Sequence, residues 1–436
     1  MAEIRPFRGI RYDQGVVGDL SQVICPPYDI ITDEQQRIYQ DRSGYNAILL
    51  ERPLLVVEES GLEYHEGYGR AAAVFQQWLS EGVLRVDDCP AFYLHDHYFA
   101  YQGRRTKRRE LIACVRLRPW YDGIYPHEET TLQAKHDRLE LVRACRASFS
   151  PIFALYQDSE GEVAEVLCEA SGDGPVVEFG DSHGGHVVWA ITEPELIRRI
   201  RELMVSRSLY VADGHHRYET ALLYQQEQGS LYPELAHTSE QGAFNYAMMT
   251  LADFSDEGLV VLPVCRLVRG VSESAMVGLE SRLRDYFALE CVSLGESPGQ
   301  GLGGEVLNGA LIGVLGLSPH CLLLLKPRED VSTENMMPRD RSQAYRCFSV
   351  SLLDHLLLDR TLGIPYNSDN IAYSADVNEV YRQVSEGRYQ LAFLPSPPQM
   401  EMVRAVADAK DRMPRKSTYF WPKAPAGLII SSLDSL

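Results

Sequence analysis

The stretch from Leu209 to Leu223 predicts a strand, a tight turn and a helix in direct succession. Its first four residues form a short apolar run with β-branched and aromatic character, which favours a strand. Asp213-Gly214 interrupts the run, and Tyr218, Ala221 and Leu222 then recur at helical spacing. Two histidines and an arginine occupy the first helical turn, where backbone N–H groups and the helix dipole favour an anion. The pattern therefore predicts an anion site here, with phosphate as the first candidate.

The rest of the chain predicts helices and strands in irregular alternation. Thr32 and Gln35 have the spacing of a capping box in front of a helix. Further helices are predicted at about 70–80, 131–147 (core candidates Leu132, Leu139 and Val142), 162–170, 195–207, 273–287, 346–362, 377–386 and 400–411. Strands are predicted at 91–101, 110–117, 151–156, 244–252, 259–263 and 391–395, with two more around a turn in 311–325 and glycine-rich loops near 173–185 and 294–309. This order favours an α+β fold with a mixed sheet over a regular doubly wound sheet.

The length of the chain constrains its domain organisation, and its net charge constrains the partners that it can bind. The 436 residues are too many for one typical core, so we expect an N-terminal α+β region over residues 1–205 and a C-terminal α+β region over residues 206–436. The net charge of −19 disfavours binding to nucleic acid or to an acidic membrane surface, because both need basic surfaces. A small anionic ligand needs only a local basic cluster and stays compatible with this charge.

Cysteine usage and hydropathy favour a cytoplasmic location. The nine cysteines are scattered, odd in number and contain no C-x-x-C pair, which predicts reduced thiols rather than a disulfide framework or a zinc site. Residues 1–15 carry charges where an export signal needs an apolar run. The most apolar stretch, residues 311–325, is interrupted by Ser318-Pro319-His320 and is too short for a membrane span.

The strongest candidate site is the polar cluster from Asp213 to Arg217. Gly214 permits close approach of the backbone, and the planar fork of Arg217 is suited to two phosphate oxygens. His215 and His216 can donate to phosphate or transfer a proton near neutral pH. The alternative is a capped helix whose histidines satisfy buried carbonyls, but the number of polar donors in one turn favours an anion site.

Two further stretches are candidates for chemistry. His127 and Glu128, followed by Thr130, stand at a loop-to-helix junction that suits acid–base work, although the helix dipole alone also favours acidic residues there. Lys416 beside the hydroxyl of Ser417 suits an oxygen-rich ligand, and the alternative is a structural strand with a solvated lysine.

Two further clusters are weaker candidates for a functional site. His95-Asp96-His97 places two histidines on one strand face as a possible metal pair, but no third ligand is evident, so we expect an exposed face and assign no metal. The basic run from Arg104 to Arg109 is predicted to be the solvated tip of a hairpin rather than a nucleic-acid site.

Five elements resemble, in the same order, the hallmarks of a widespread bacterial and archaeal family of unknown function. They are PPYD at 26–29, HE-x-T at 127–130, K-x-D-R-L at 135–139, ADGHHRYETA at 212–221 and MPxKSTYFxPK at 413–423. The sequence departs from that family at Cys265, where a histidine is usual, so no role of that histidine carries over.

The turn also resembles the phosphate-binding turn of the ParB/sulfiredoxin superfamily, whose members include CTP-using partitioning proteins, ATP-using sulfiredoxins and free-serine kinases. Gly214, His216 and Arg217 match the superfamily glycine and its two phosphate-gripping residues. His215 stands where sulfiredoxins have their nucleophilic cysteine, so the resemblance argues against sulfinic-acid repair. It implies a ParB/sulfiredoxin-like phosphate-binding core.

The resemblance implies a nucleotide-dependent phosphotransferase acting on a small hydroxyl metabolite, with free serine as the leading acceptor. The implied cofactors are ATP, ADP or another nucleotide, together with Mg²⁺. The implied phosphate ligands are Gly214, His216, Arg217 and Lys416, the catalytic candidates are Glu128, Asp213 and His215, and the substrate-binding candidates are His127, Thr130, Arg138 and Ser417. The alternative is a non-catalytic nucleotide-sensing ParB-like regulator. A metal-dependent hydrolase using His215 and His216 ranks last, because no carboxylate stands at a diagnostic metal spacing.

Overall fold

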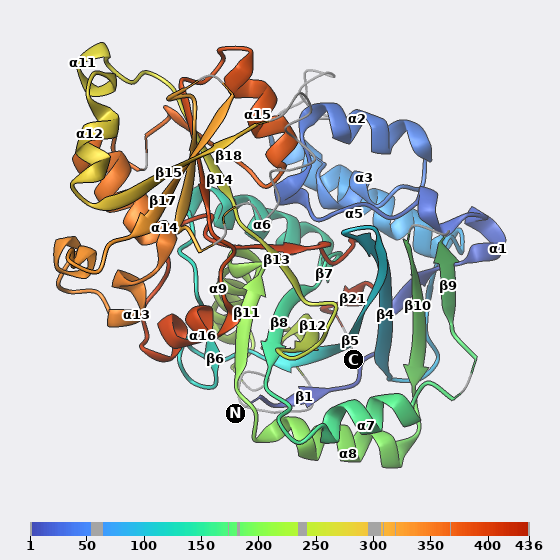
Figure 1. Ribbon diagram of the computed structural model, residues 1–436. Coiled ribbons are helices and arrows are strands. Elements are labelled where there is room, and N and C mark those ends of the chain that lie inside the picture. The colour runs from blue at the N-terminus through green and yellow to red at the C-terminus, as the bar shows by residue number, and fades with distance from the viewer. Residues whose placement is uncertain are drawn as a thin grey trace. The chain divides into compact units, whose positions relative to one another are not determined.

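The chain forms two compact units. The computed structural model (Figure 1) describes residues 2–53, 64–172, 174–180, 184–233, 242–294, 307, 309–318, 320–366 and 368–434. Unit 1 comprises Met1–Pro126, Thr130–Val260 and Pro422–Leu436, and unit 2 comprises His127–Glu129 and Val261–Trp421. The boundary expected near residue 205 differs from this division, because strands that follow residue 205 complete a sheet that begins before it.

Unit 1 is built on a mixed sheet, which has nine strands among the described residues. Its order is β6-β11-β8-β12-β5-β4-β10-β9, and β1 pairs with β5. Most neighbours are antiparallel, whereas β6–β11 and β8–β12 are parallel. The strands are β1 (Ile4–Arg5), β4 (Phe92–Tyr101), β5 (Arg104–Arg116), β6 (Ile124–Tyr125), β8 (Ile152–Tyr156), β9 (Val177–Gly180), β10 (Gly184–Ile191), β11 (Leu209–Asp213) and β12 (Tyr246–Asp253). The expected α+β class with a mixed sheet is confirmed.

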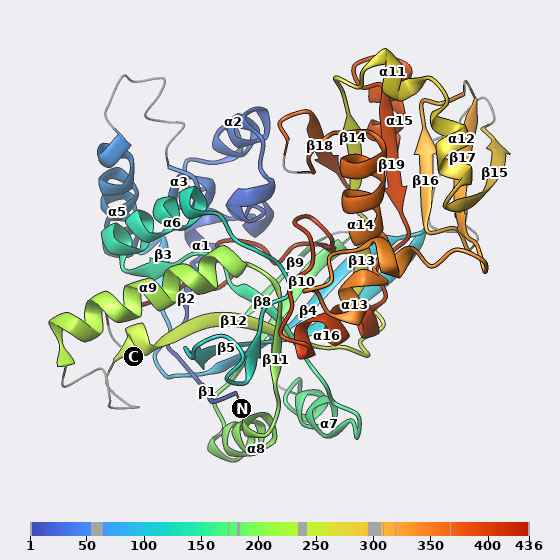
Figure 2. The ribbon, with the colours of Figure 1, turned by 90° about the vertical axis from the view of Figure 1, so that its left-hand side faces the viewer.

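Helices cover both faces of this sheet. Phe92 and Leu94 of β4 face a core formed with α7 and α8, which lie side by side in Figures 1 and 2, whereas Tyr93 faces a core formed with α5 and α6. The helices are α5 (Tyr64–Ser80), α6 (Leu132–Cys145), α7 (Glu162–Glu169), α8 (Pro194–Val205) and α9 (His215–Leu231). Helix α5 starts six residues earlier than predicted. On α6, Leu139 is buried as predicted and Val142 is half-buried. The prediction that Leu132 belongs to the core is wrong, because its side chain is exposed.

Smaller elements complete unit 1. Thr32 and Gln35 form the predicted capping box of α2. A turn at Gln102-Gly103 joins β4 and β5. Arg104 to Arg109 form part of β5 itself, so their assignment to a hairpin tip is wrong. The remaining elements are β2 (Ile10–Tyr12), α1 (Gln14–Val17), α2 (Asp33–Arg42), α3 (Ile48–Glu51), β3 (Leu84–Val86), β7 (Ala147–Ser148) and β21 (Ser431–Ser432), with one-turn 3₁₀ helices at Leu20–Gln22, Tyr28–Ile30 and Ala243–Asn245.

Unit 2 is a three-layer arrangement around a second sheet, which has six strands among its described residues. The order is β15-β17-β16-β19-β14-β18. Leu322 and Leu324 of β17 pack with α15, whereas Leu323 and Leu325 pack with α12 and α14, as the strand alternation requires. The strands are β14 (Cys265–Val268), β15 (Phe287–Ser293), β16 (Ile312–Leu315), β17 (Cys321–Pro327), β18 (Ile371–Ser374) and β19 (Leu391–Pro395); β20 (Tyr419–Trp421) pairs with β13 (Val260–Leu262).

The helices of unit 2 are more broken than predicted. The helix expected at 273–287 is two short helices: the first ends where Val277 adopts an extended conformation, and Gly278, with a φ of +70°, is the N-cap of the second. Phe287 already begins β15. The helix expected at 346–362 is α14 followed by a π-helical stretch. The helices are α11 (Glu273–Met276), α12 (Leu279–Arg284), α13 (Gln343–Arg346), α14 (Ser349–Leu352), the π-helix Leu353–Thr361, α15 (Val377–Ser385) and α16 (Met400–Asp408), with a 3₁₀ turn at Thr333–Met336.

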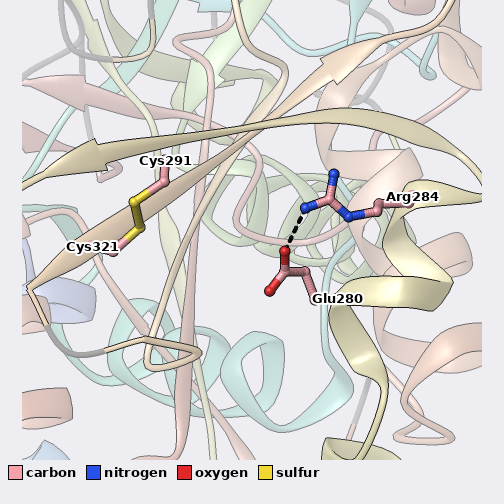
Figure 3. Close-up of a disulfide and its surroundings, with 4 residues drawn as sticks. All are labelled: Glu280, Arg284, Cys291 and Cys321. Atoms are coloured by element: carbon pink, nitrogen blue, oxygen red, sulfur yellow. Dashed lines mark hydrogen bonds and ion pairs between the residues drawn. A yellow bond between two sulfur atoms is a disulfide. The ribbon is translucent and has the colours of Figure 1, made fainter.

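A disulfide contradicts the expectation that all cysteines are reduced. Cys291 on β15 and Cys321 on β17 are bonded, with their Cα atoms 5.9 Å apart (Figure 3). The antiparallel register of these strands brings together residues 30 apart in sequence, which cysteine spacing alone does not reveal. The reduced state predicted for these two cysteines is therefore wrong.

The sequence also predicted that the apolar stretch 311–325 does not span a membrane and that the glycine-rich stretch 294–309 is a loop. No helix among the described residues has the length and apolar character that crossing a membrane requires. Residues 311–325 form two strands around a turn, as predicted. The glycine-rich loop expected at 294–309 falls mostly outside the described residues.

Candidate functional site

The predicted strand, turn and helix are confirmed as β11, Gly214 and α9. Strand β11 lies between β6 and β8, and its first four residues are buried. Gly214 has a φ of +88°, and a Cβ atom at this position would lie 3.0 Å from the Arg217 guanidinium. Only glycine suits both the backbone conformation and the space. The chain therefore passes directly from a buried strand into the positive end of a long helix.

Asp213 is held between two cations at this turn. A terminal nitrogen of Arg217 donates to one carboxylate oxygen at 2.7 Å, and Lys423 pairs with the other. The side chains of Asp213, Arg217 and Lys423 are 13%, 11% and 8% exposed. Burial opposes ionisation, but Lys423 and Arg217 outweigh it and hold the pKa of Asp213 well below its usual range. Two cations thus share one carboxylate beside the N-terminus of α9.

Lys423 is a site residue that the sequence analysis missed. It is the last residue of the MPxKSTYFxPK element, from which Lys416 was chosen instead. The second terminal nitrogen of Arg217 donates to the Pro151 carbonyl, so both cations are fixed by partners before any ligand arrives. A fixed cation loses little conformational entropy when it meets an anion.

His216 links the start of α9 to the start of α6. Its Nε2 accepts a hydrogen bond of 2.9 Å from the backbone N–H of Thr131, the N-cap residue of α6. This contact assigns the ring proton to Nδ1. His215 is buried, with its ring centroid 6.3 Å from that of Trp120. The two histidines therefore differ in environment, and His216 is the more accessible.

Glu219, one turn into α9, is a shared acceptor for three groups. Trp120 Nε1, Thr130 Oγ1 and Lys135 Nζ approach its carboxylate at 3.1, 2.5 and 3.0 Å. Burial opposes its charge, yet these hydrogen bonds lower its pKa. The hydroxyl of Thr130, a predicted substrate ligand, is thus engaged within the protein.

A second buried charge cluster adjoins Arg217. Glu51, at the end of α3, accepts a hydrogen bond of 2.8 Å from Ser150 Oγ, and its backbone carbonyl accepts one of 2.7 Å from Arg138. The Arg138 guanidinium lies 3.9 Å from the centre of the Tyr28 ring. Burial raises the pKa of Glu51 above its usual value. The sequence did not reveal Glu51 as a site residue. Its carboxylate accepts a hydrogen bond from the backbone N–H of Tyr28, which belongs to the PPYD element.

A cavity begins at these charges and extends along α9. Its polar wall includes Glu51, Arg138, Ser150 and Arg217. Apolar and aromatic side chains form most of the remaining wall, among them Phe149, Ile152, Tyr224, Phe244 and Met248. An apolar cavity with a few convergent polar groups has the general character of a small-molecule site.

The other predicted site residues gather in unit 2. The backbone N–H of Lys416 donates to Glu128, and Glu128 forms an isolated bridge with Met413. His127 Nε2 lies 2.9 Å from Thr418 Oγ1. Ser417 is fully buried and donates to the Pro414 carbonyl at 2.6 Å, which gives it a structural role in this turn. His127 and Glu128 therefore meet the MPxKSTYF element within unit 2.

The predicted residues thus fall into two groups that belong to different units. Unit 1 brings together Asp213, Gly214, His215, His216, Arg217, Thr130 and Arg138, together with Glu51 and Lys423, which were not predicted. Unit 2 brings together His127, Glu128, Lys416 and Ser417. The PPYD, K-x-D-R-L and DGHHR elements share unit 1.

Comparison with known proteins establishes the family. The model of the family "Protein of unknown function (DUF1015)" matches residues 4–352, and the chain belongs to this family. No curated protein matches the chain.

Three solved structures show a distant likeness. A free serine kinase in complex with AMP has 13% identity and a TM-score of 0.35, covering 72% of this chain and 89% of that one. A conserved hypothetical protein from Pyrococcus furiosus has 13% identity and a TM-score of 0.33, covering 72% and 94%. SbnI with a C-terminal truncation, from Staphylococcus aureus, has 10% identity and a TM-score of 0.34, covering 72% and 84%.

Proposed function

We propose that this member of the DUF1015 family binds the phosphates of a nucleotide at the N-terminus of α9 and transfers a phosphoryl group to a small hydroxyl metabolite. The nucleotide is ATP or ADP, and free serine is the first acceptor to test. One observation carries the proposal: Arg217 and Lys423 share Asp213 beside the N-terminus of α9, where the absence of a side chain at Gly214 makes room for the Arg217 guanidinium. The match of Gly214, His216 and Arg217 to the ParB/sulfiredoxin turn supports it.

The residues around the Gly214 turn fit phosphate better than they fit a metal ion alone. Phosphate would approach the backbone at Gly214, with Arg217 and Lys423 supplying positive charge. Asp213 and Glu219 already have cationic partners, so Mg²⁺ would be held mainly by the nucleotide phosphates and water. Bound Mg²⁺ would neutralise charge that develops during transfer.

The acceptor hydroxyl must also lose a proton to a base. In the buried charge cluster beside Arg217, Glu51 is the carboxyl group whose proton affinity suits this role. Its pKa is raised by burial, whereas the pKa of Asp213 is held low by two cations, which makes Asp213 a weak base. Glu51 lines the same cavity as Arg217. The catalytic role of Glu128 and the phosphate-binding role of Lys416, both in unit 2, stay predictions.

Lys423→Met is expected to weaken nucleotide binding at least tenfold, as measured by calorimetry. The variant removes one charge-assisted contact to phosphate, and tenfold corresponds to about 1.4 kcal/mol. Arg217 still pairs with Asp213 in the variant, so the turn keeps an ion pair and the fold persists.

The matched control for this variant is Lys107→Met, which removes a half-exposed lysine 3.5 Å from Asp96. Its nucleotide affinity should equal that of the wild type. Equal affinity in Lys423→Met and the wild type would remove Lys423 from the phosphate site.

Glu51→Gln is expected to lower phosphoryl transfer at least about 100-fold while nucleotide affinity changes less than about threefold. Glutamine retains an acceptor for Ser150 and Tyr28 but cannot take a proton. Product formation from the acceptor and nucleotide affinity are measured on the same preparation. Glu81→Gln, an exposed change after α5, is the control. Undiminished turnover in Glu51→Gln would assign proton removal to another group.

A further inference from the structure

Three histidines converge on one face of the sheet of unit 1. His95 and His97 lie on β4, and His186 on β10 stands directly opposite His97 in the antiparallel register. One ring nitrogen from each lies within 4.8 Å of the other two. His95 and His97 are 1% and 6% exposed, so the exposed face expected for them is wrong. The third ligand that the sequence did not reveal is His186.

The partners of His95 direct a lone pair into this cluster. Its Nδ1 lies 2.8 Å from the Glu110 carboxylate, and an ionised carboxylate can only accept, so Nδ1 carries the proton. Arg108 Nε donates to the other oxygen of the same carboxylate at 2.5 Å, which favours its ionised form. The His95 Nε2 is then an acceptor, and it lies 2.9 Å from Nδ1 of His186. Histidine ligands of metal ions commonly donate their other N–H to a carboxylate in this way.

Hydrogen bonding within the protein does not satisfy the whole cluster. A bond from His186 to His95 accounts for that pair, but Nδ1 of His97 is buried with no partner among the described residues. An unsatisfied buried donor or acceptor costs about 1–3 kcal/mol. One ion coordinated by all three rings would give the His97 ring a partner within the cluster.

We propose that His95 Nε2, His186 Nδ1 and a ring nitrogen of His97 bind a divalent late first-row transition-metal ion, with zinc as the first candidate. Three imidazoles suit Zn²⁺, whereas Mg²⁺ and Ca²⁺ prefer oxygen ligands. Zinc–nitrogen bonds of about 2.0–2.1 Å in a tetrahedron place nitrogens about 3.3 Å apart, so the 2.9 Å pair opens slightly on binding. The fourth position is left for water.

Hydrogen bonds connect the histidine cluster to the turn at Gly214. His186 Nδ1 donates to His95 in the metal-free chain, so on binding the ion the His186 ring carries its proton on Nε2 instead. Glu110 is paired with Arg108, which donates to the carbonyl of Pro422 at 2.9 Å. Pro422 precedes Lys423, so the histidine cluster and the proposed phosphate site share one hydrogen-bonded network. The metal proposal does not depend on the proposed function.

The test is a titration of the metal-stripped, untagged full chain with zinc chloride, followed by calorimetry. We expect one ion per chain in the wild type, and at least 100-fold weaker binding in His97→Ala and in His186→Ala. His136→Ala, which removes an exposed histidine on α6, should bind zinc as the wild type does. Undiminished binding in both cluster variants, or no stoichiometric binding in the wild type, would overturn the proposal.

A second measurement needs no variant and so remains decisive if the alanine variants fail to fold. Crystals of the wild-type chain soaked with zinc are measured at the zinc absorption edge. We expect an anomalous peak within about 2.3 Å of a nitrogen of each of the three rings. A peak elsewhere, or none at this cluster, contradicts the assignment.

Discussion

Asp213→Asn is expected to destabilise unit 1 by about 3–5 kcal/mol at pH 7, because it leaves Arg217 and Lys423 as buried cations without their shared anion. Both side chains are almost inaccessible to water, so solvent cannot replace the carboxylate. Asparagine keeps the shape of the side chain, which limits the change to its charge. The measurement is unfolding by urea, followed by fluorescence and circular dichroism.

The pH dependence gives an independent signature of this carboxylate. Its pKa is lower in the folded than in the unfolded chain, so its stabilisation is present above about pH 4 and is lost as the pH falls further. Asp213→Asn should lack this part of the acid-induced loss. Adding inorganic phosphate should stabilise the variant more than the wild type, because a bound anion replaces the missing charge.

Asp122→Asn is the matched control, because Asp122 forms an exposed pair with Arg118 at 3.2 Å. Exposed pairs contribute about 0–1 kcal/mol, so this variant should unfold almost as the wild type does. If Asp213→Asn were as stable as Asp122→Asn, the description of Asp213 as the anion shared by two buried cations would be wrong.

Arg266→Met is expected to destabilise unit 2 by about 3–5 kcal/mol. Arg266 is fully buried and donates to the carbonyls of Val264, Lys416 and Arg415 at 2.6, 2.9 and 3.1 Å. Its Nε also lies 3.4 Å from the buried Asp354. Methionine fills much of the volume but leaves three carbonyls and a carboxylate without this partner. The loss should appear as a lower urea midpoint of the transition that reports unit 2.

Arg269→Met serves as the control for this variant, because Arg269 stands one residue beyond β14 and is exposed. The hydrogen bond from its guanidinium to the Asp369 carbonyl is long at 3.4 Å. Similar midpoints for the two variants would show that Arg266 does not hold the segment around Lys416 in place.

The strand, turn and helix at 209–231 were predictable because every signal in them is local. A buried apolar run, a glycine that adopts a positive φ and helical spacing lie within a few residues of one another. The strands that end at Tyr101 and Pro395 were found for the same reason. Broken helices were harder to predict, because the break at Val277-Gly278 contains only a valine and a glycine that a helix can also tolerate in its interior.

The partners in the site were not predictable, because they arrive from distant parts of the chain. Glu51 ends a four-residue helix, and its contacts to Arg138 and Ser150 depend on how α3 packs. Lys423 reaches Asp213 across 210 residues of sequence. His186 was hidden because the glycines before it resemble a turn, although they begin β10.

Sequence also shows which side chains can donate but not which groups accept. Thr130 and Ser417 were predicted to contact substrate, whereas in the structure their hydroxyls donate to Glu219 and to Pro414.

The alternative function is a nucleotide sensor without catalysis, and turnover distinguishes the two. A phosphotransferase consumes nucleotide only when a suitable hydroxyl acceptor is present, whereas a sensor binds nucleotide and does not turn it over.

The most direct test of the phosphate site is a crystal structure of the wild-type chain with ADP and Mg²⁺. We predict a phosphate group within hydrogen-bond distance of the backbone N–H groups at Gly214 to His216, with Lys423 in contact with one of its oxygens. A nucleotide bound elsewhere, with this turn unchanged, would contradict the central claim.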